Sequence, residues 1–187
     1  MKKISTYRRS SVIPLRMAFV MWLLFTYQFY SGHDLGFLGI YPRHLLGLIG
    51  VLVSPLVHGD VNHIMSNTVP LILLGAVLFH FYPLIARVVF VNSYLVTGLL
   101  VWLFGREFFH IGASGVIYSL AFFLMLFGLF RKDKKSLLIS IIVVVVYGGL
   151  VYGLMPNDPQ TSWESHVFGA GVGTSLAFVF RNRARVD

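Results

Sequence analysis

Apolar residues dominate the chain in six long runs that short polar segments separate. The runs cover, roughly, residues 12–30, 63–81, 84–104, 114–130, 137–155 and 167–180. A helix that crosses a membrane needs about 20 apolar residues, and the first five runs meet that length. The sixth reaches it only with residues 163–166, which we expect it to include. The pattern predicts an all-α membrane protein, a bundle of six transmembrane helices in one domain over residues 1–187.

The segments outside these runs add two expectations. Residues 45–57 are apolar but too short to span, and Pro55 lies near their end, so we expect a re-entrant or interfacial element in the first loop. Residues 1–11 lack the short apolar region and small-residue cleavage site of a signal peptide. The first run is therefore expected to be an uncleaved signal-anchor helix.

Composition supports a membrane protein. Hydrophobic residues make up 57% of the chain and charged residues 12%, whereas a soluble domain carries about 25% charged residues. The chain has no cysteine, which excludes disulfides and thiolate metal sites.

The net charge of +8 is distributed unevenly over the predicted loops. With six spans, one side of the membrane receives every basic residue except Arg43 and Arg106. The other side receives every acidic residue except Asp133 and Asp187. The positive-inside rule then places both termini in the cytoplasm, with basic tails at residues 1–11 and 181–187. We therefore interpret the positive charge as a signal that sets the orientation of the spans in the lipid bilayer. No basic stripe with interleaved aromatics lies outside the spans, so no nucleic-acid partner is expected.

Polar residues inside the spans gather at three places, in residues 58–67, 112–115 and 164–166. Even-numbered spans run from outside to inside in this topology, so all three clusters fall at outer helix ends. Polar groups at such depth are costly and indicate function. Three clusters at one level of the membrane predict a single site.

Ser114 lies between Gly112 and Gly115 at a transition from loop to helix. Taken alone it is compatible with a helix cap, because serine favours that position. The alternative is a nucleophile on a tight turn, where the unpaired amides of the first helical turn can stabilise an oxyanion.

His166 taken alone is compatible with an interfacial residue. However, Gly169 and Gly173 follow it at the spacing that lets transmembrane backbones approach closely. Packing against Gly115 and its helical neighbours would bring the imidazole within reach of the serine, as a nucleophile and its base require. Tyr118 lies one turn beyond Ser114 and is either aromatic core or a brace for the histidine ring.

His63 and Asn67 are four residues apart and share one helix face. A zinc site is an alternative, but no glutamate follows His63 and the helix offers no acidic third ligand, so no metal is expected. A pair of hydrogen-bond donors for an oxyanion fits better. His58 is expected either to support this pair or, with Asp60, to cap the helix.

These motifs resemble those of the rhomboid proteases. Residues 58–67 match their His-x4-His-x3-Asn pattern, residues 112–115 their Gly-x-Ser-Gly, and residues 166–173 their His-x-x-Gly-x-x-x-Gly. The order and the placement on the second, fourth and sixth spans agree as well. The first loop, from residue 39 to Pro55, resembles the stretch before the second helix in many bacterial members. The six-span length resembles the minimal prokaryotic form.

The resemblance implies a cofactor-free intramembrane serine endopeptidase. Ser114 would attack the substrate carbonyl, His166 would accept its proton, and Tyr118 would brace that histidine. His63, Asn67 and the Ser114 amide would form the oxyanion hole. The implied substrates are transmembrane segments of other proteins, cleaved near the outer face of a bacterial plasma membrane.

The resemblance also implies a lateral gate between the second and fifth spans. Peptide hydrolysis in a bilayer needs water, and residues 105–113 are candidates for irregular backbone facing a wet cavity. A substrate helix must unwind to expose its carbonyls, so we predict small or helix-destabilising residues near the cleavage point. One departure concerns the first loop, which has no Trp-Arg pair; here Arg43 follows Pro42.

Two other function classes remain open at this point. A catalytically silent relative would bind membrane-protein clients, although such relatives usually lack the serine or the histidine. A small transporter or metal-handling protein would use His58, His63 and His166, but no acidic residue lies in the middle of a span. The other histidines are expected in loops or at the membrane interface: His33, His44, His80 and His110.

Overall fold

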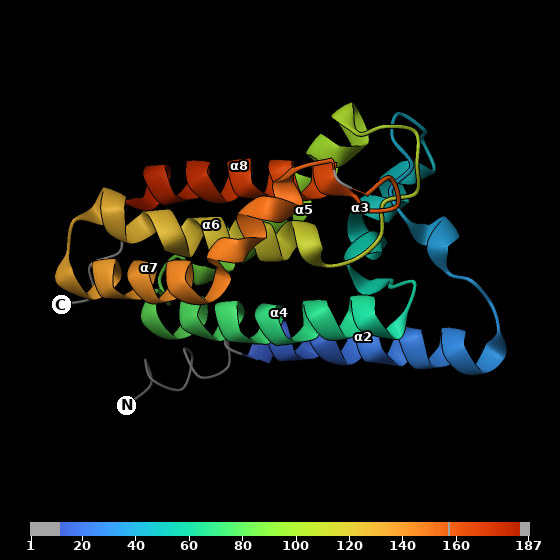
Figure 1. Cartoon of the computed structure of the whole chain (residues 1–187), viewed down its shortest axis with the longest axis horizontal. Coiled ribbons are helices and arrows are strands. Elements are labelled where there is room, and N and C mark those ends of the chain that lie inside the picture. Colours follow the sequence, from blue (N-terminus) through green and yellow to red (C-terminus); the bar gives the residue numbers. More distant parts are fainter. Residues whose placement is uncertain (1–11, 157, 184–187) are drawn as a thin grey trace.

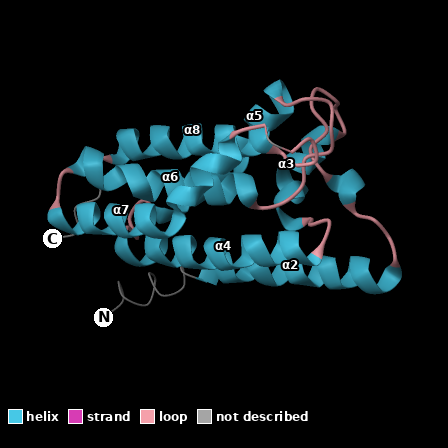
Figure 2. Ribbon diagram, viewed as in Figure 1, coloured by secondary structure: helices cyan, strands magenta, loops and turns pink. Residues whose placement is uncertain are grey.

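The computed structural model describes residues 12–156 and 158–183, and within them the regular elements are helices (Figures 1 and 2). The α-helices are α2 (Val12–Ser31), α3 (Gly47–Val53), α4 (Val61–Phe81), α5 (Ala86–Phe104), α6 (Ser114–Arg131), α7 (Lys134–Tyr147) and α8 (Trp163–Phe180). The 3-10 helices are η1 (Gly36–Leu38), η2 (Ser54–Leu56) and η3 (Gly148–Leu154). The predicted basic tail at residues 1–11, and residues 184–187 of the other tail, lie outside the described residues.

Five helices among these residues are long and apolar enough to cross a membrane: α2, α4, α5, α6 and α7 continued by η3. The sixth, α8, has 18 residues, and Glu164 and His166 in its first turn lower its apolar character. It lies along α6 in Figure 1 and completes the bundle. The predicted all-helical membrane bundle is confirmed, and the protein is an integral membrane protein.

Helix α6 forms the centre of the bundle. In its apolar segment, 67% of the residues are buried inside the protein, whereas in the span formed by α7 and η3 the buried share is 17%. It contacts α4, α5, α7 and α8. Glycines allow these close approaches: a Cβ on Gly128 would strike the Ser136 backbone of α7, and the Ser140 hydroxyl donates to the Leu124 carbonyl at 2.7 Å. Because α6 begins at Ser114, the predicted nucleophile lies at the end of the most buried helix.

The predicted span at residues 137–155 divides into two helical types. Asp133 caps α7 by accepting from the Ser136 amide at 3.0 Å, and the α-helix ends at Tyr147. From Gly148 the chain tightens into η3. Two consecutive glycines, Gly148 and Gly149, have low helix propensity, which explains the change at this point.

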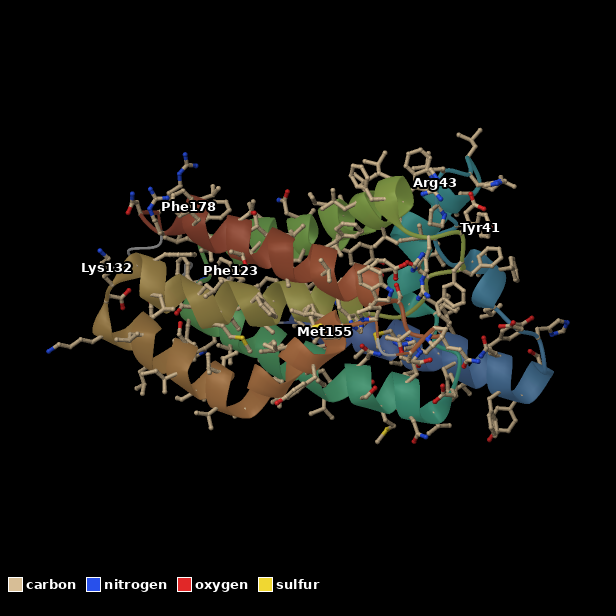
Figure 3. The ribbon with its side chains drawn as sticks, turned by 45° about the horizontal axis from the view of Figure 1, so that its top comes forward. Tyr41, Arg43, Phe123, Lys132, Met155 and Phe178 are labelled. Carbon is tan, nitrogen blue, oxygen red and sulfur yellow. The ribbon has the colours of Figure 1, made fainter. Side chains whose placement is uncertain are left out.

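The first loop carries α3 and η2, in agreement with the short apolar element expected there. Leu45 and Leu46 are each 80% exposed on its surface, as expected of an interfacial segment. Arg43 does not point away from the protein: its Nη1 donates to the Gly105 carbonyl at 2.7 Å. Figure 3 shows Arg43 and Tyr41 together at one end of the molecule, with Lys132 and Phe178 at the other.

Candidate active site

The three polar clusters meet at one cavity of about 660 Å³. Helix α6 contributes Ser114 and Tyr118, α8 contributes His166, and α4 contributes His63 and Asn67. Each comes from the helix end that the sequence assigned to the outer side. Helix ends supply unpaired backbone groups and loop flexibility, so they are natural places for a polar site within an apolar bundle.

Ser114 and His166 form a hydrogen-bonded pair. The Ser114 Oγ lies 2.9 Å from His166 Nε2, and His166 Nδ1 lies 2.8 Å from the Gly153 carbonyl oxygen. A carbonyl oxygen can only accept, so a neutral ring carries its proton on Nδ1 and Nε2 accepts from the serine hydroxyl. This tautomer suits a general base. The sequence offered no signal for Gly153, because its role belongs to the backbone.

Tyr118 stacks on the base. Its ring lies 4.1 Å from the His166 ring, centroid to centroid, with an interplanar angle of 4°. This is the contact that the spacing of Ser114 and Tyr118 suggested. A Cβ on Gly153 would strike the Tyr118 hydroxyl. Glycine at that position therefore lets η3 approach both rings.

Small residues bring α8 against α6. A Cβ on Gly169 would strike the Gly115 carbonyl oxygen, and one on Gly173 would strike the Ser119 carbonyl oxygen. These are the faces that the sequence pattern paired. Backbone-to-backbone contact of this kind fixes the distance between two helices tightly. It thereby fixes the separation of Ser114 and His166.

A turn before α6 presents Ser114. Gly112 has φ +101°, a conformation that residues with a side chain rarely adopt, and a Cβ there would strike the His63 imidazole. The Gly112 amide donates to the Ser54 carbonyl at 2.9 Å, which ties the turn to η2. The Ser114 amide lies in the first turn of α6, where helical amides lack carbonyl partners within the helix.

His63 and Asn67 line the same cavity wall on α4. The Asn67 Nδ2 donates to the His63 carbonyl at 2.8 Å. A carboxamide nitrogen carries two hydrogens, so one is left for a ligand in the cavity. Asp60 caps α4 by accepting from the His63 amide at 2.9 Å, which settles the capping role for Asp60.

His58 is 1% exposed and packs edge-on against the His63 ring, with 4.8 Å between centroids. Its Nε2 lies 3.4 Å from the Ala113 amide, which donates to it. Burial, together with the neighbouring His63, lowers the pKa of His58 to about 3. His58 is therefore a neutral imidazole that supports both the turn before α6 and the His63 ring.

A second polar network joins the loop before α6 to the start of α8. Arg106 Nε lies 2.7 Å from Glu164 Oε1, and its Nη2 donates to the Thr161 carbonyl at 2.6 Å. His110 Nδ1 lies 2.6 Å from the Ser162 hydroxyl. The sequence analysis placed His110 in a loop or at the interface. It lies in a loop, but it is 1% exposed and bonded to a residue of the cavity wall.

The remaining histidines were expected in loops or at the membrane interface. His33 and His44 are exposed loop residues, as expected, and His80 is exposed in the last turn of α4. Across the described part of the chain, no group of three or more His, Cys, Asp or Glu side chains is arranged to hold a metal ion.

Comparison with known proteins identifies the family. The model of the Rhomboid domain matches residues 46–183. Uncharacterized proteins of Mycobacterium tuberculosis and Mycobacterium bovis are each 36% identical over 160 residues, covering 80% of this chain and 66% of the relative. An uncharacterized protein of Mycobacterium leprae is 31% identical over 143 residues, covering 71% and 56%. The chain thus spans 66% of the length of the first two relatives. The matched region contains every motif of the cavity described above, and the chain belongs to the rhomboid family.

Proposed function

We propose that the protein is an intramembrane serine endopeptidase that cleaves transmembrane segments of other membrane proteins. The observation that carries the proposal is the Ser114–His166 pair: 2.9 Å from Oγ to Nε2, with the opposite ring nitrogen held by the Gly153 carbonyl. A serine whose proton is already directed at a neutral imidazole is poised for attack.

The reaction follows from this geometry in two halves. Ser114 Oγ attacks the scissile carbonyl carbon while its proton passes to His166 Nε2. The resulting oxyanion accepts hydrogen bonds from the Ser114 amide and from the side chains of His63 and Asn67. Collapse of this intermediate breaks the C–N bond, and the imidazolium gives its proton to the leaving amine. A water molecule then hydrolyses the acyl-enzyme ester, with His166 accepting and returning the proton.

The membrane sets the substrate class. Rhomboid membership and the cavity at one end of the bundle favour a substrate helix that enters laterally, with α4 and the span formed by α7 and η3 as the gate. Helical carbonyls are held in i to i+4 bonds, so the substrate must unwind near the cleavage point, which favours small or helix-destabilising residues there. The charge distribution of the sequence favours cytoplasmic termini and cleavage near the outer face of a bacterial plasma membrane.

The test is covalent labelling by a fluorophosphonate in mild detergent. Wild-type protein is expected to be labelled, and Ser114→Ala and His166→Ala are expected to lose labelling while retaining the wild-type thermal melt. Absence of labelling in folded wild-type protein would contradict the proposal. It would favour a catalytically silent rhomboid relative that binds membrane-protein clients.

A further inference from the structure

The cavity wall contains a second serine–histidine pair that the proposed dyad does not use. Ser162, just before α8, lines the cavity together with Ser114. Its Oγ lies 2.6 Å from His110 Nδ1 and 2.5 Å from the Ser165 Oγ. His110 Nε2 lies 3.0 Å from the Arg106 carbonyl oxygen. His110 and Ser162 are 1% and 8% exposed, so this is a built, interior network.

The Arg106 carbonyl decides where the protons lie in this network. A carbonyl oxygen only accepts, so His110 Nε2 must carry a proton and donate it. Burial lowers the pKa of His110, so the ring is neutral and its Nδ1 has no proton. Nδ1 therefore accepts, and Ser162 must donate its single hydroxyl proton to His110.

This assignment fixes what Ser162 can offer to a ligand. A hydroxyl has one proton and two lone pairs. The Ser162 proton is donated to His110. In the hydrogen bond between Ser162 and Ser165, the Ser165 hydroxyl must therefore be the donor, and it uses one lone pair of the Ser162 oxygen. The second lone pair remains for the cavity. Ser162 is thus an acceptor, whereas His63, Asn67 and the Ser114 amide are the groups suited to donate.

A peptide in an extended conformation presents N–H donors as well as carbonyl acceptors, and both need partners once the substrate helix has unwound. We propose that Ser162 accepts a hydrogen bond from a main-chain N–H of the substrate and that His110 is the positioning residue that holds Ser162 in this state. The proposal rests on the proposed protease function. It makes Ser162 a substrate-binding residue, distinct from the nucleophile and the base.

The surroundings hold this acceptor in place. Arg106, whose carbonyl orients His110, is itself anchored by the Thr161 carbonyl, one residue before Ser162, and by Glu164, two residues after it. Glu164 is 4% exposed, and the ion pair closes a loop of contacts around Ser162. The backbone amide and carbonyl of His110 both pair with Ile40 at 2.9 Å, which fixes the loop from the other side.

The experiment separates binding of a peptide from reactivity of the serine. A fluorophosphonate has no peptide N–H, so its labelling rate reports the dyad alone. For Ser162→Ala we expect kcat/KM on a transmembrane substrate to fall about tenfold, mainly through KM, equivalent to about 1.4 kcal/mol. The labelling rate should change by less than about twofold.

Matched variants sharpen the result. Ser162→Thr keeps the hydroxyl and should retain most of the wild-type kcat/KM. Ser66→Ala makes the same change at another serine of the cavity wall and should behave as wild type. The Ser66 hydroxyl donates to the main-chain carbonyl of His63 at 3.0 Å and not to an imidazole ring. His110→Ala frees the Ser162 proton and should raise KM in the same direction as Ser162→Ala.

Three results would overturn the inference. Equal losses of labelling and kcat/KM in Ser162→Ala would mean that Ser162 supports the dyad. A burst of product from the transmembrane substrate with accumulation of acyl-enzyme in Ser162→Ala would mean that Ser162 positions the hydrolytic water. Unchanged kcat/KM would mean that it binds nothing. Failure of the protease proposal is a different outcome, recognised by a wild-type protein that is not labelled at all.

Discussion

At the residue scale, three neighbours fix the His166 ring, and each acts on a different degree of freedom. The Gly153 carbonyl selects the tautomer, Ser114 occupies the other nitrogen, and Tyr118 fixes the ring plane. In the proposed dyad, a backbone carbonyl and an aromatic face take the place of the aspartate that is the usual third member of a serine triad. A neutral partner stabilises an imidazolium less than a carboxylate does, so in the proposed mechanism the activity depends more strongly on the orientation of the ring.

Tyr118 therefore offers a graded test. Tyr118→Phe keeps the ring and should leave fluorophosphonate labelling within about twofold of wild type. Tyr118→Ala removes the stacking surface, worth about 0.5–1.5 kcal/mol for an aromatic pair, and should slow labelling about tenfold. Equal labelling rates for the two variants would show that the ring does not orient His166.

His58 predicts how stability depends on pH. Its folded-state pKa of about 3 lies below the ordinary value of 6.5, chiefly because the ring is buried. Below pH 6.5 the His58 ring therefore binds a proton in the unfolded chain but not in the folded protein. The contribution of His58 to the free energy of unfolding is complete above pH 6.5 and falls as the pH drops toward 3. At about 1.4 kcal/mol per pH unit, His58 alone contributes a loss of about 2 kcal/mol between pH 7 and pH 5.

Thermal melts across that pH range measure this loss. His58→Asn should reduce the slope of this dependence, even if its melting temperature is lower throughout, and the slope that remains includes the contribution of His110, whose pKa burial also lowers. The exposed His33 serves as a control, and His33→Asn should keep the wild-type slope. A wild-type slope in His58→Asn would assign the pH dependence to other groups.

At the element scale, the contact between α6 and α8 depends on glycines that face a backbone. Gly173 meets the Ser119 carbonyl, whereas Gly171, two residues earlier, has open space where a Cβ would lie. The two positions differ in environment but share a helix and a residue type. Replacing each glycine by alanine therefore separates two effects: both substitutions change the helix propensity, but only the one at Gly173 disturbs packing against α6.

We expect Gly173→Ala to lower the free energy of unfolding by about 1–3 kcal/mol, because an added methyl group forces the helices apart. It should also slow fluorophosphonate labelling, since the same contact sets the distance from Ser114 to His166. Gly171→Ala should be neutral or slightly stabilising. Melting temperatures and labelling rates of the two variants decide the matter, and equal effects would contradict a packing role for Gly173.

Much of the element pattern could be predicted because apolar runs in a membrane protein end where charged residues begin. Helix α6, for example, was predicted over 114–130 and extends over Ser114–Arg131. The change from α7 to η3 was missed, because hydropathy does not distinguish one helical type from another. The Gly153 carbonyl and the His110–Ser162 contact were missed for another reason. One is a backbone group, and the other joins residues 52 positions apart whose types have no joint signature.

At the scale of the whole molecule, the cavity lies where α6 begins, at Ser114, and the basic loop at Lys132, labelled in Figure 3, follows the other end of the same helix. The chain contains no cysteine, so a single introduced thiol reports its own side of the membrane. We expect Glu107→Cys, in the loop before α6, to react with an impermeant maleimide in spheroplasts or intact membranes of right-side-out orientation. Lys134→Cys should react only after permeabilisation. The reverse pattern would place the termini outside.

The Gly153 carbonyl that orients His166 belongs to η3, which continues α7 in a span of which only 17% is buried inside the protein. Ser114, in contrast, belongs to α6, the most buried of the spans. One of the three contacts that hold His166 therefore comes from the span that the protein covers least, so we expect lipid to act on the proposed dyad through Gly153. A bilayer whose thickness differs from the length of α7 and η3 would tilt that span first. Labelling of Ser114 in vesicles of graded acyl-chain length should accordingly peak at one thickness, which would make the membrane itself an effector of the proposed protease.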